Sequence, residues 1–385
     1  LTRLRISAVR LLYVCVAKIP TLRSSESKEL IGKITAVFFR CLESRHDLIV
    51  STAKLGLTLV VSEQLTSKDM LQSNLRPILG NLSDYRRFTE PYLKGFSRVL
   101  EVLSSWFNVN LGDKLLEHLK RWLDPVQVVS ENNWPPGTEM KIAAGILDLF
   151  HLLPKAAFRF TEHLITLVLR LEVNLTVAYP GIARMGLKSV RSASTSPFRA
   201  PLLRFCNRHA AEAVTFFLKR ISTPPFRNLF LALIFADDAG PLRKELCDKP
   251  ERIIEATLRS SSETSGAIGS FQSFFGVMIV DSLSSMNPEW LGQNRALFDA
   301  VVDVWNSSER RGRLRREEAL PLEHLRESRL LVDCILRFCK LHHDEVSVLF
   351  QLLSVFSIRT LNDFSFVRDF LENYIAEHYS QVEKQ

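Results

Sequence analysis

Two cysteines and two histidines in the C-terminal part of the chain are residue types that bind transition metals in proteins. Cys334, Cys339, His342 and His343 all fall within ten residues of one predicted helix. Cys339 and His343 share a face of that helix, but Cys334 lies about 140° from Cys339 at about 100° per residue. Because four ligands placed in this way cannot surround one ion, we interpret the thiols as buried and the histidines as surface residues.

A pair of adjacent carboxylates, Asp237 and Asp238, is the next candidate for metal binding or acid–base chemistry. The pair stands at the predicted end of a helix, just ahead of Gly240 and Pro241, where aspartate normally terminates or caps helices. Glycine-rich phosphate loops, serine-hydrolase elbows, HExxH zinc motifs and kinase catalytic-loop motifs do not occur in the sequence. We therefore predict no catalytic, cofactor-binding or metal-binding residue and no enzymatic activity.

The most basic run of the chain consists of Arg310, Arg311, Arg313, Arg315 and Arg316. Such a run can bind nucleic acid or act as a nuclear-import signal, but glutamates flank it at positions 309, 317 and 318 and no aromatic residue interleaves. Burying five arginines within seven residues would cost more than any pairing returns. We therefore expect residues 309–318 to form a solvent-exposed, poorly ordered connector that makes only weak, salt-sensitive contacts with acidic partners or DNA.

Ser196 and Pro197 form a short motif with two interpretations. A serine followed by proline is a substrate pattern for proline-directed protein kinases. The same pair is typical of a helix N-cap followed by proline at the first helical position. Since capping explains the pair without modification, we predict that Ser196 caps the helix that follows.

Helices must position all of these candidates, and the clearest predicted helix is Thr138–Pro154. Its apolar residues fill well over half of the helical wheel, whereas a surface helix needs an apolar stripe of only about 100°. The thin polar stripe consists of Lys141, Gly145 and Asp148. We expect this helix to pack against neighbours on two sides, with Leu147 and Phe150 buried.

Helical periodicity recurs along the whole chain, and no segment shows convincing strand alternation. Helices are predicted at 1–19, 25–42, 48–61, 67–82, 87–107, 111–123, 138–154, 155–175, 182–190, 199–208, 210–221, 225–236, 241–247, 250–258, 266–285, 294–305, 320–341, 345–358 and 364–379. Ala8 and Ala53 align two similar segments 45 residues apart, within the period of about 40–47 residues of HEAT and armadillo units. A small residue at this position lets the second helix of a unit approach its partner closely. The sequence therefore predicts an all-α, HEAT/armadillo-like α-solenoid of antiparallel helix pairs, continuous over residues 1–385.

The composition is ordinary for a soluble protein, with a mild excess of basic residues. Hydrophobic residues make up 46% and charged residues 24%, and the formal net charge is +8, too small by itself to predict direct nucleic-acid binding. No uncharged run reaches the ~20 apolar residues of a membrane span, and arginines interrupt the first apolar helix, so we expect no signal peptide. The six cysteines include no CxxC pair, which indicates a reduced intracellular protein. Because helical patterning runs close to both ends, we expect a segment of a longer protein.

Several sequence blocks occur in order across nearly the whole chain. They are Leu75–Leu79 (LRPIL), His118–Trp122 (HLKRW), Glu139–Ile142 with Leu149–Pro154 (EMKI and LFHLLP), Ser196–Arg199 with Arg208–His209 (SPFR and RH), and Leu349–Leu353 (LFQLL). Together these blocks resemble the HEAT-repeat region of the TRRAP family, the transformation/transcription domain-associated proteins and their fungal counterparts. Their collinearity is more specific than any single block.

The resemblance implies a segment of a very large, kinase-inactive member of the PI3-kinase-related class, a pseudokinase. It implies a nuclear subunit of SAGA-type and related histone acetyltransferase complexes that acts as a docking scaffold. The implied partners are transcription activators, with their acidic activation domains, and other subunits of these complexes, without cofactor, small-molecule substrate or membrane. A basic surface suits such acidic, disordered segments. The alternative is a transport-receptor-like helical-repeat adaptor that binds other proteins.

Overall fold

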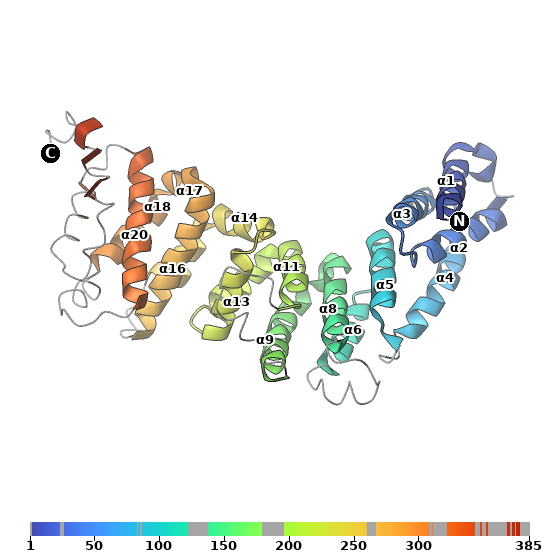
Figure 1. Cartoon of the computed structure of the whole chain (residues 1–385), viewed down its shortest axis with the longest axis horizontal. Coiled ribbons are helices and arrows are strands. Elements are labelled where there is room, and N and C mark those ends of the chain that lie inside the picture. Colours follow the sequence, from blue (N-terminus) through green and yellow to red (C-terminus); the bar gives the residue numbers. More distant parts are fainter. Residues whose placement is uncertain are drawn as a thin grey trace. The chain divides into compact units, whose positions relative to one another are not determined.

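The computed structural model describes residues 2–23, 27–82, 84, 87–121, 138–178, 196–259, 267–307, 310 and 322–342, together with scattered positions between 347 and 377. Every regular element in these ranges is helical, and none of their residues belongs to a strand (Figure 1). The chain divides into two compact units, Leu1–His209 and Ala210–Gln385. The predicted all-α class is confirmed.

The first unit is a succession of α-helices joined by short turns. The helices are α1 (Thr2–Lys18), α2 (Lys28–Cys41), α3 (Asp47–Ser62), α4 (Lys68–Asn81), α5 (Glu90–Leu103), α6 (Asn110–Arg121), α8 (Thr138–Leu149), α9 (Thr161–Ala178) and α11 (Arg199–Arg208). Short 3₁₀ segments lie at Pro20–Arg23, Ser104–Trp106, Phe150–Leu152 and Lys155–Phe160. Local signals fix the starts of these helices: the Thr89 hydroxyl accepts a hydrogen bond from the Tyr92 amide (3.3 Å), and Pro91 occupies the first turn of α5.

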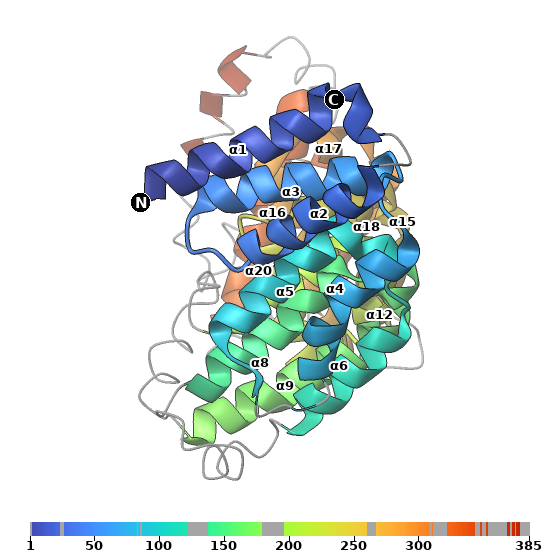
Figure 2. The same ribbon diagram turned by 90° about the vertical axis from the view of Figure 1, so that its right-hand side faces the viewer.

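The helices of the first unit form two layers. α1, α3, α5, α8 and α11 are successive neighbours in one row. Behind that row α2 contacts α3 and α4, α6 contacts α8, and α9 contacts α11. Figure 2 shows α2 and α4 beside α3 and α5. This repeated pairing of consecutive helices is the HEAT-like arrangement expected from the sequence.

The central helix has the predicted burial. Leu147 and Phe150 are both 0% exposed, and α8 contacts α5, α6 and α11. The Phe150 ring meets the rings of Phe160 and Phe205 edge-on, at centroid distances of 5.6 and 6.4 Å. The α-helix ends at Leu149, one residue before Phe150, and continues as a 3₁₀ turn.

The alignment of Ala8 with Ala53 pairs two neighbouring helices correctly, but only one of the two alanines is buried. The aligned helices α1 and α3 are neighbours in the same row, and Ala53 is fully buried. Ala8, however, is exposed. The face of α3 that carries Ala53 is covered by α2, and a Cβ on Gly56 would come within 2.6 Å of the Phe38 ring. The matching face of α1 is open, and Leu11 on it is 64% exposed.

The second unit is also built from helices. They are α12 (Ala210–Lys219), α13 (Pro224–Ile234), α14 (Gly240–Asp248), α15 (Pro250–Ile253), a π-helical turn (Ile254–Leu258), α16 (Ala267–Met286), α17 (Pro288–Gln293), α18 (Arg295–Asn306) and α20 (Leu322–Leu341). α12 packs against α14, and α16 packs against α17 and α20.

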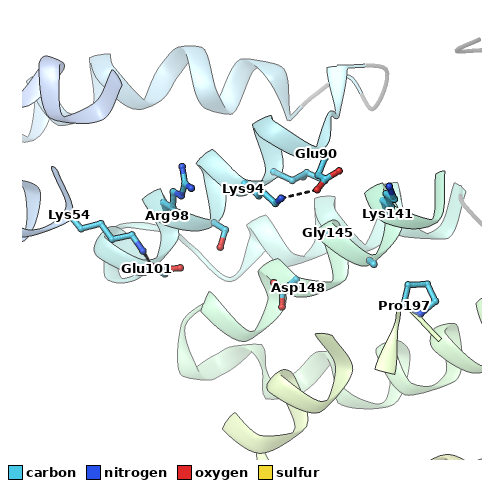
Figure 3. A pocket seen from close by; sticks show the side chains of 12 residues that line it. Lys54, Glu90, Lys94, Arg98, Glu101, Lys141, Gly145, Asp148 and Pro197 are labelled. Carbon is cyan, nitrogen blue, oxygen red and sulfur yellow. Dashed lines mark hydrogen bonds and ion pairs between the residues drawn. The ribbon is translucent and has the colours of Figure 1, made fainter. Parts of the chain in front are cut away.

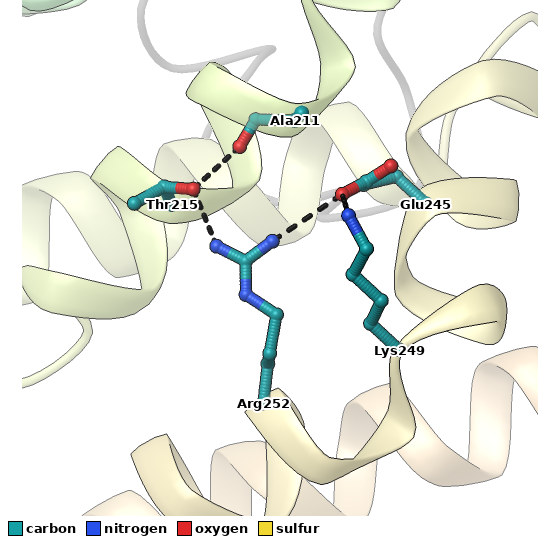
Figure 4. Close-up of polar contacts among 5 residues, drawn as sticks. All are labelled: Ala211, Thr215, Glu245, Lys249 and Arg252. Carbon is teal, nitrogen blue, oxygen red and sulfur yellow. Dashed lines mark hydrogen bonds and ion pairs between the residues drawn. The ribbon is translucent and has the colours of Figure 1, made fainter.

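Arginines connect the helices of the second unit. Figure 4 shows Arg252 of α15 donating to the Thr215 hydroxyl on α12 and to the Glu245 carboxylate on α14, the latter at 3.3 Å. Lys249 donates to the same carboxylate (2.8 Å). Because the Arg252 and Glu245 side chains are largely shielded from water, this cluster holds three helices together more firmly than a surface pair would.

The expected exposure of the basic connector is wrong at its first arginine. Arg310 is only 4% exposed, and its guanidinium lies 4.1 Å from the centroid of the Trp305 ring. It donates to the Trp305 carbonyl oxygen (3.1 Å) and to the Ser328 hydroxyl (2.8 Å). An aromatic face and two acceptors offset the burial of a single guanidinium, which the argument about five mutually repelling arginines did not consider. The other four arginines lie outside the described residues.

Some predicted elements also lie outside the described residues. They are the helix at 182–190 and most of those at 345–358 and 364–379. Among the helices that the structure describes, none has the length and apolar character needed to cross a membrane.

Candidate functional site

A cavity of about 520 Å³ opens between α3, α5 and α8 of the first unit, and we call it the α5–α8 groove (Figure 3). Its walls come mainly from α5 and α8. Lys54 of α3 closes one end, and Pro197, which precedes α11, lies at the other (Figure 3). The groove therefore lies on the row of helices that α2, α6 and α9 pack behind.

The floor of the groove is apolar and partly lacks side chains. It includes Leu93 from α5 and Ala144 and Gly145 from α8. A Cβ added to Gly145 would stand 2.9 Å from Leu93 Cδ1, which is closer than carbon atoms normally approach. Glycine at this position therefore lets α5 and α8 come together and leaves a smooth apolar strip between them.

One rim of the groove carries two cations around one carboxylate. Lys94 donates to Glu90 at 2.8 Å, one turn apart on α5. The pKa of the Glu90 carboxyl lies below its usual value because of the Lys94 hydrogen bond, the attraction of that ammonium group, and a further attraction from Lys141 on α8. Two ammonium groups thus act on one carboxylate, so this rim has a formal excess of one positive charge.

The remaining charged groups of the groove are held by their neighbours. Lys54 and Glu101 form an ion pair between α3 and α5. Arg98 donates to the carbonyl oxygens of Leu42 (2.6 Å) and Ser44 (2.8 Å), which ties the end of α2 to α5.

Asp148 at the centre of the groove is held by neighbours outside it (Figure 3). Arg204 donates to its carboxylate at 2.6 Å, and the His151 ring also lies beside it, at 3.3 Å. Burial opposes ionisation of Asp148, but hydrogen bonds from His151 and Arg204 outweigh it, so its pKa lies below the usual value.

The arrangement of side chains in the groove suits the binding of a ligand rather than catalysis. The twelve lining residues include no histidine or cysteine, and each of their acids pairs with a lysine or an arginine. A smooth apolar strip between charged rims can hold a segment of another polypeptide, with side chains on the strip and charges on the rims.

The residues first considered as metal ligands occupy unrelated places in the described structure. Cys334 and Cys339 are each 0% exposed, and burial raises the pKa of the Cys334 thiol far above its usual range. His342 Nε2 pairs with the Gly292 carbonyl oxygen at 2.8 Å. His343 lies outside the described residues, within which no three histidine, cysteine or acidic side chains gather in a way that could hold a metal ion.

The two other candidate motifs have different outcomes. Asp237 and Asp238 are exposed between α13 and α14, as expected of residues at a helix end. Ser196 is not the N-cap of α11, because that helix begins at Arg199 and the turn at 197–198 precedes it. The Ser196 hydroxyl accepts one hydrogen bond, from the Phe198 amide at 3.4 Å. The predicted helix 199–208 has the observed bounds of α11, and only the prediction that Ser196 is its N-cap is wrong.

Part of the groove was visible in the sequence, although its meaning was not. Lys141, Gly145 and Asp148, the polar stripe of the central helix, all line the groove. A glycine at the centre of a polar stripe was the available signal. The partner residues Glu90 and Lys94 come from α5, some fifty positions earlier than Lys141, and nothing local in the sequence connects them with it.

Comparison with known proteins also indicates a helical-repeat family. The family model described as the Tra1 HEAT repeat ring region matches residues 1–385. The "Probable transcription-associated protein 1" of Dictyostelium discoideum is 32% identical over 96% of this chain, which covers 8% of that protein. The human "Transformation/transcription domain-associated protein" is 26% identical over the whole chain, which covers 10% of it.

A yeast relative carries the names of two complexes. The "SAGA complex/NuA4 acetyltransferase complex subunit TRA1" of Saccharomyces cerevisiae is 25% identical over 80% of this chain, which covers 8% of that protein. The chain thus spans about a tenth of the length of the curated relatives described here. Because the family match includes every residue, no part of the chain is a catalytic domain. These 385 residues belong to the HEAT repeat ring region of the Tra1/TRRAP family.

Proposed function

We propose that this chain is a non-catalytic scaffold segment of a nuclear transcription coactivator subunit that docks activators and other subunits in a SAGA-type histone acetyltransferase complex. The name of the yeast relative, a subunit of SAGA and NuA4, supports membership of such a complex. The proposal assigns no catalytic residue, cofactor, metal, small-molecule substrate or membrane contact. It takes residues 1–385 as one continuous solenoid.

The α5–α8 groove is the docking surface in this proposal, and its occupant is an acidic segment of an activation domain. The observation that carries it is the rim on which two lysines, Lys94 and Lys141, stand with one carboxylate, Glu90, which Lys94 contacts. An acidic segment lying along the groove adds the second carboxylate that this rim lacks, while its apolar side chains cover Leu93 and Ala144. Such segments are disordered when free and combine acidic with apolar residues.

The test reverses both lysines of the rim. In the K94E/K141E variant we expect affinity for a fluorescent acidic activation-domain peptide to fall about tenfold at low salt, since each exposed pair contributes ~0–1 kcal/mol. The loss should shrink at high salt, because ions screen such pairs. Fluorescence anisotropy measures both effects, and a thermal melt verifies that the variant is folded.

The matched control is K114E/K120E, which makes the same change in net charge on exposed positions of α6. It should bind the peptide like the unmodified chain. Equal losses in the two variants would show attraction by net charge alone and would contradict docking in the groove.

The alternative, a transport-receptor-like adaptor, is separated by its partners. Affinity capture from nuclear extract with the intact protein should recover acetyltransferase-complex subunits. Recovery of a small GTPase with nucleoporins, and of no acetyltransferase subunit, would favour the adaptor instead.

A further inference from the structure

The Ser196–Pro197 pair stands beside the groove and lacks the capping role that the sequence suggested. Pro197 is exposed and lines the groove together with Lys141 (Figure 3). Ser196 is half-buried. The N-cap position of α11 is Phe198, with no side-chain capping bond. The Ser196 hydroxyl makes one long contact, to the Phe198 amide at 3.4 Å. Helix capping therefore leaves the Ser-Pro pair unexplained.

The residues after Ser196 complete a kinase substrate pattern. Proline follows directly, and a basic residue, Arg199, stands three positions after the serine. Thr223–Pro224 provides a comparison: there threonine is the N-cap of α13, proline is its first residue, and the third position after the threonine is Phe226. The second pair occupies the N-cap and first position of its helix, although the Thr223 hydroxyl makes no capping bond, and it lacks the basic residue.

We propose that Ser196 is a phosphorylation site for a proline-directed protein kinase, and that its phosphate lowers the affinity of the α5–α8 groove for acidic ligands. The regulatory part rests on the proposed docking function. In the reaction Ser196 Oγ attacks the γ-phosphorus of ATP. The bond between that phosphorus and the β–γ bridging oxygen breaks, ADP leaves, and the hydroxyl proton passes to the base of the kinase.

The phosphate acts through charge. A phosphoserine carries about −1.5 to −2 charges at pH 7, which reverses the formal excess of one positive charge on the neighbouring rim. Both cations of that rim line the groove with Pro197, and Figure 3 shows Lys141 nearer to Pro197 than Lys94, so Lys141 loses most of its attraction for a ligand carboxylate. An acidic segment then meets a like charge at the end of the groove where Pro197 lies.

The folded turn limits access of the kinase to this serine. Phe198 is only 2% exposed, and Arg199 is held by the Glu172 carboxylate of α9 at 2.9 and 3.4 Å. A kinase reads an extended segment, so the first turn of α11 must open before Arg199 can be recognised. The ion pair of Glu172 with Arg199 therefore slows phosphorylation of Ser196, and removing the charge of Glu172 should raise the rate of phosphorylation.

The experiment uses the purified chain, ATP and a cyclin-dependent kinase, with phosphate at each position measured by peptide mass spectrometry. Ser196 should gain phosphate in the unmodified chain and in T223A, and none should appear at position 196 in S196A. E172Q should raise the initial rate at Ser196 about threefold or more relative to an added reference peptide, as expected when a local opening becomes easier. Absence of phosphate at Ser196 in both the unmodified chain and E172Q would overturn the proposal.

Binding is measured separately on the phosphorylated T223A chain. We expect affinity for the acidic peptide to fall about threefold to tenfold at low salt, and the fall to shrink in K141A and at high salt. An unchanged affinity would overturn the regulatory role. If the unphosphorylated chain does not bind the peptide at all, the docking function fails, while the mass measurement still decides whether Ser196 is modified.

Discussion

Replacing Phe150 by alanine tests whether the central helix is held from both sides. The Phe150 ring is 0% exposed and lies between Phe160, from the next 3₁₀ segment, and Phe205 of α11. Replacing a buried phenylalanine by alanine costs about 3–5 kcal/mol, a total that includes the loss of ring contacts such as these two. We therefore expect F150A to lower the free energy of unfolding by about 4 kcal/mol.

The assay is urea denaturation followed by circular dichroism, with F158A as the matched control. Phe158 lies in the same 3₁₀ segment as Phe160 but is 49% exposed, so its replacement removes little buried area. Its effect should stay below about 1 kcal/mol. Similar midpoints for F150A and F158A would refute the conclusion that two neighbouring elements enclose Phe150.

Three further changes test other contacts. G276A places a Cβ 2.3 Å from Thr257 Oγ1, so we expect a net loss of about 1–3 kcal/mol in denaturant melts despite the better helix propensity of alanine; unchanged stability would contradict this contact. R310A removes the contact with Trp305 and two hydrogen bonds and should cost about 2 kcal/mol or more, whereas the control R326A, at an exposed position of α20, should cost less than about 1 kcal/mol. Burial lowers the pKa of His118, so the unfolded chain binds its proton more readily; stability should fall as pH drops below about 6.5, and H118Q should flatten that dependence in melts at several pH values.

Local sequence determined the helices and much of their burial. Apolar spacing placed the central helix and identified Leu147 and Phe150 as buried, because a wheel covered on more than half its circumference can only be satisfied by neighbours on two sides. A proline marked the start of α15, which begins at Pro250 as predicted. Helix type and apolar face depend on residues within one or two turns, so the sequence alone carries them.

The failures have a common physical cause. Arg310 was assigned to an exposed loop from its charged neighbours, but the Trp305 ring and the Ser328 hydroxyl provide a site for its guanidinium. Ala8 was assigned the same role as Ala53, but the two differ in what covers them. In both cases the environment comes from an element that periodicity does not locate.

The groove shows the same division most clearly. The sequence supplied Lys141 and Gly145 on one side of a helix, and it was compatible with an ordinary solvated stripe. Only the packing of α5 against α8 brought Glu90 and Lys94 to the same rim and placed Leu93 beneath Gly145. A binding surface in a helical repeat is made between helices distant in sequence, so its shape and charge depend on tertiary contacts that no single helix encodes.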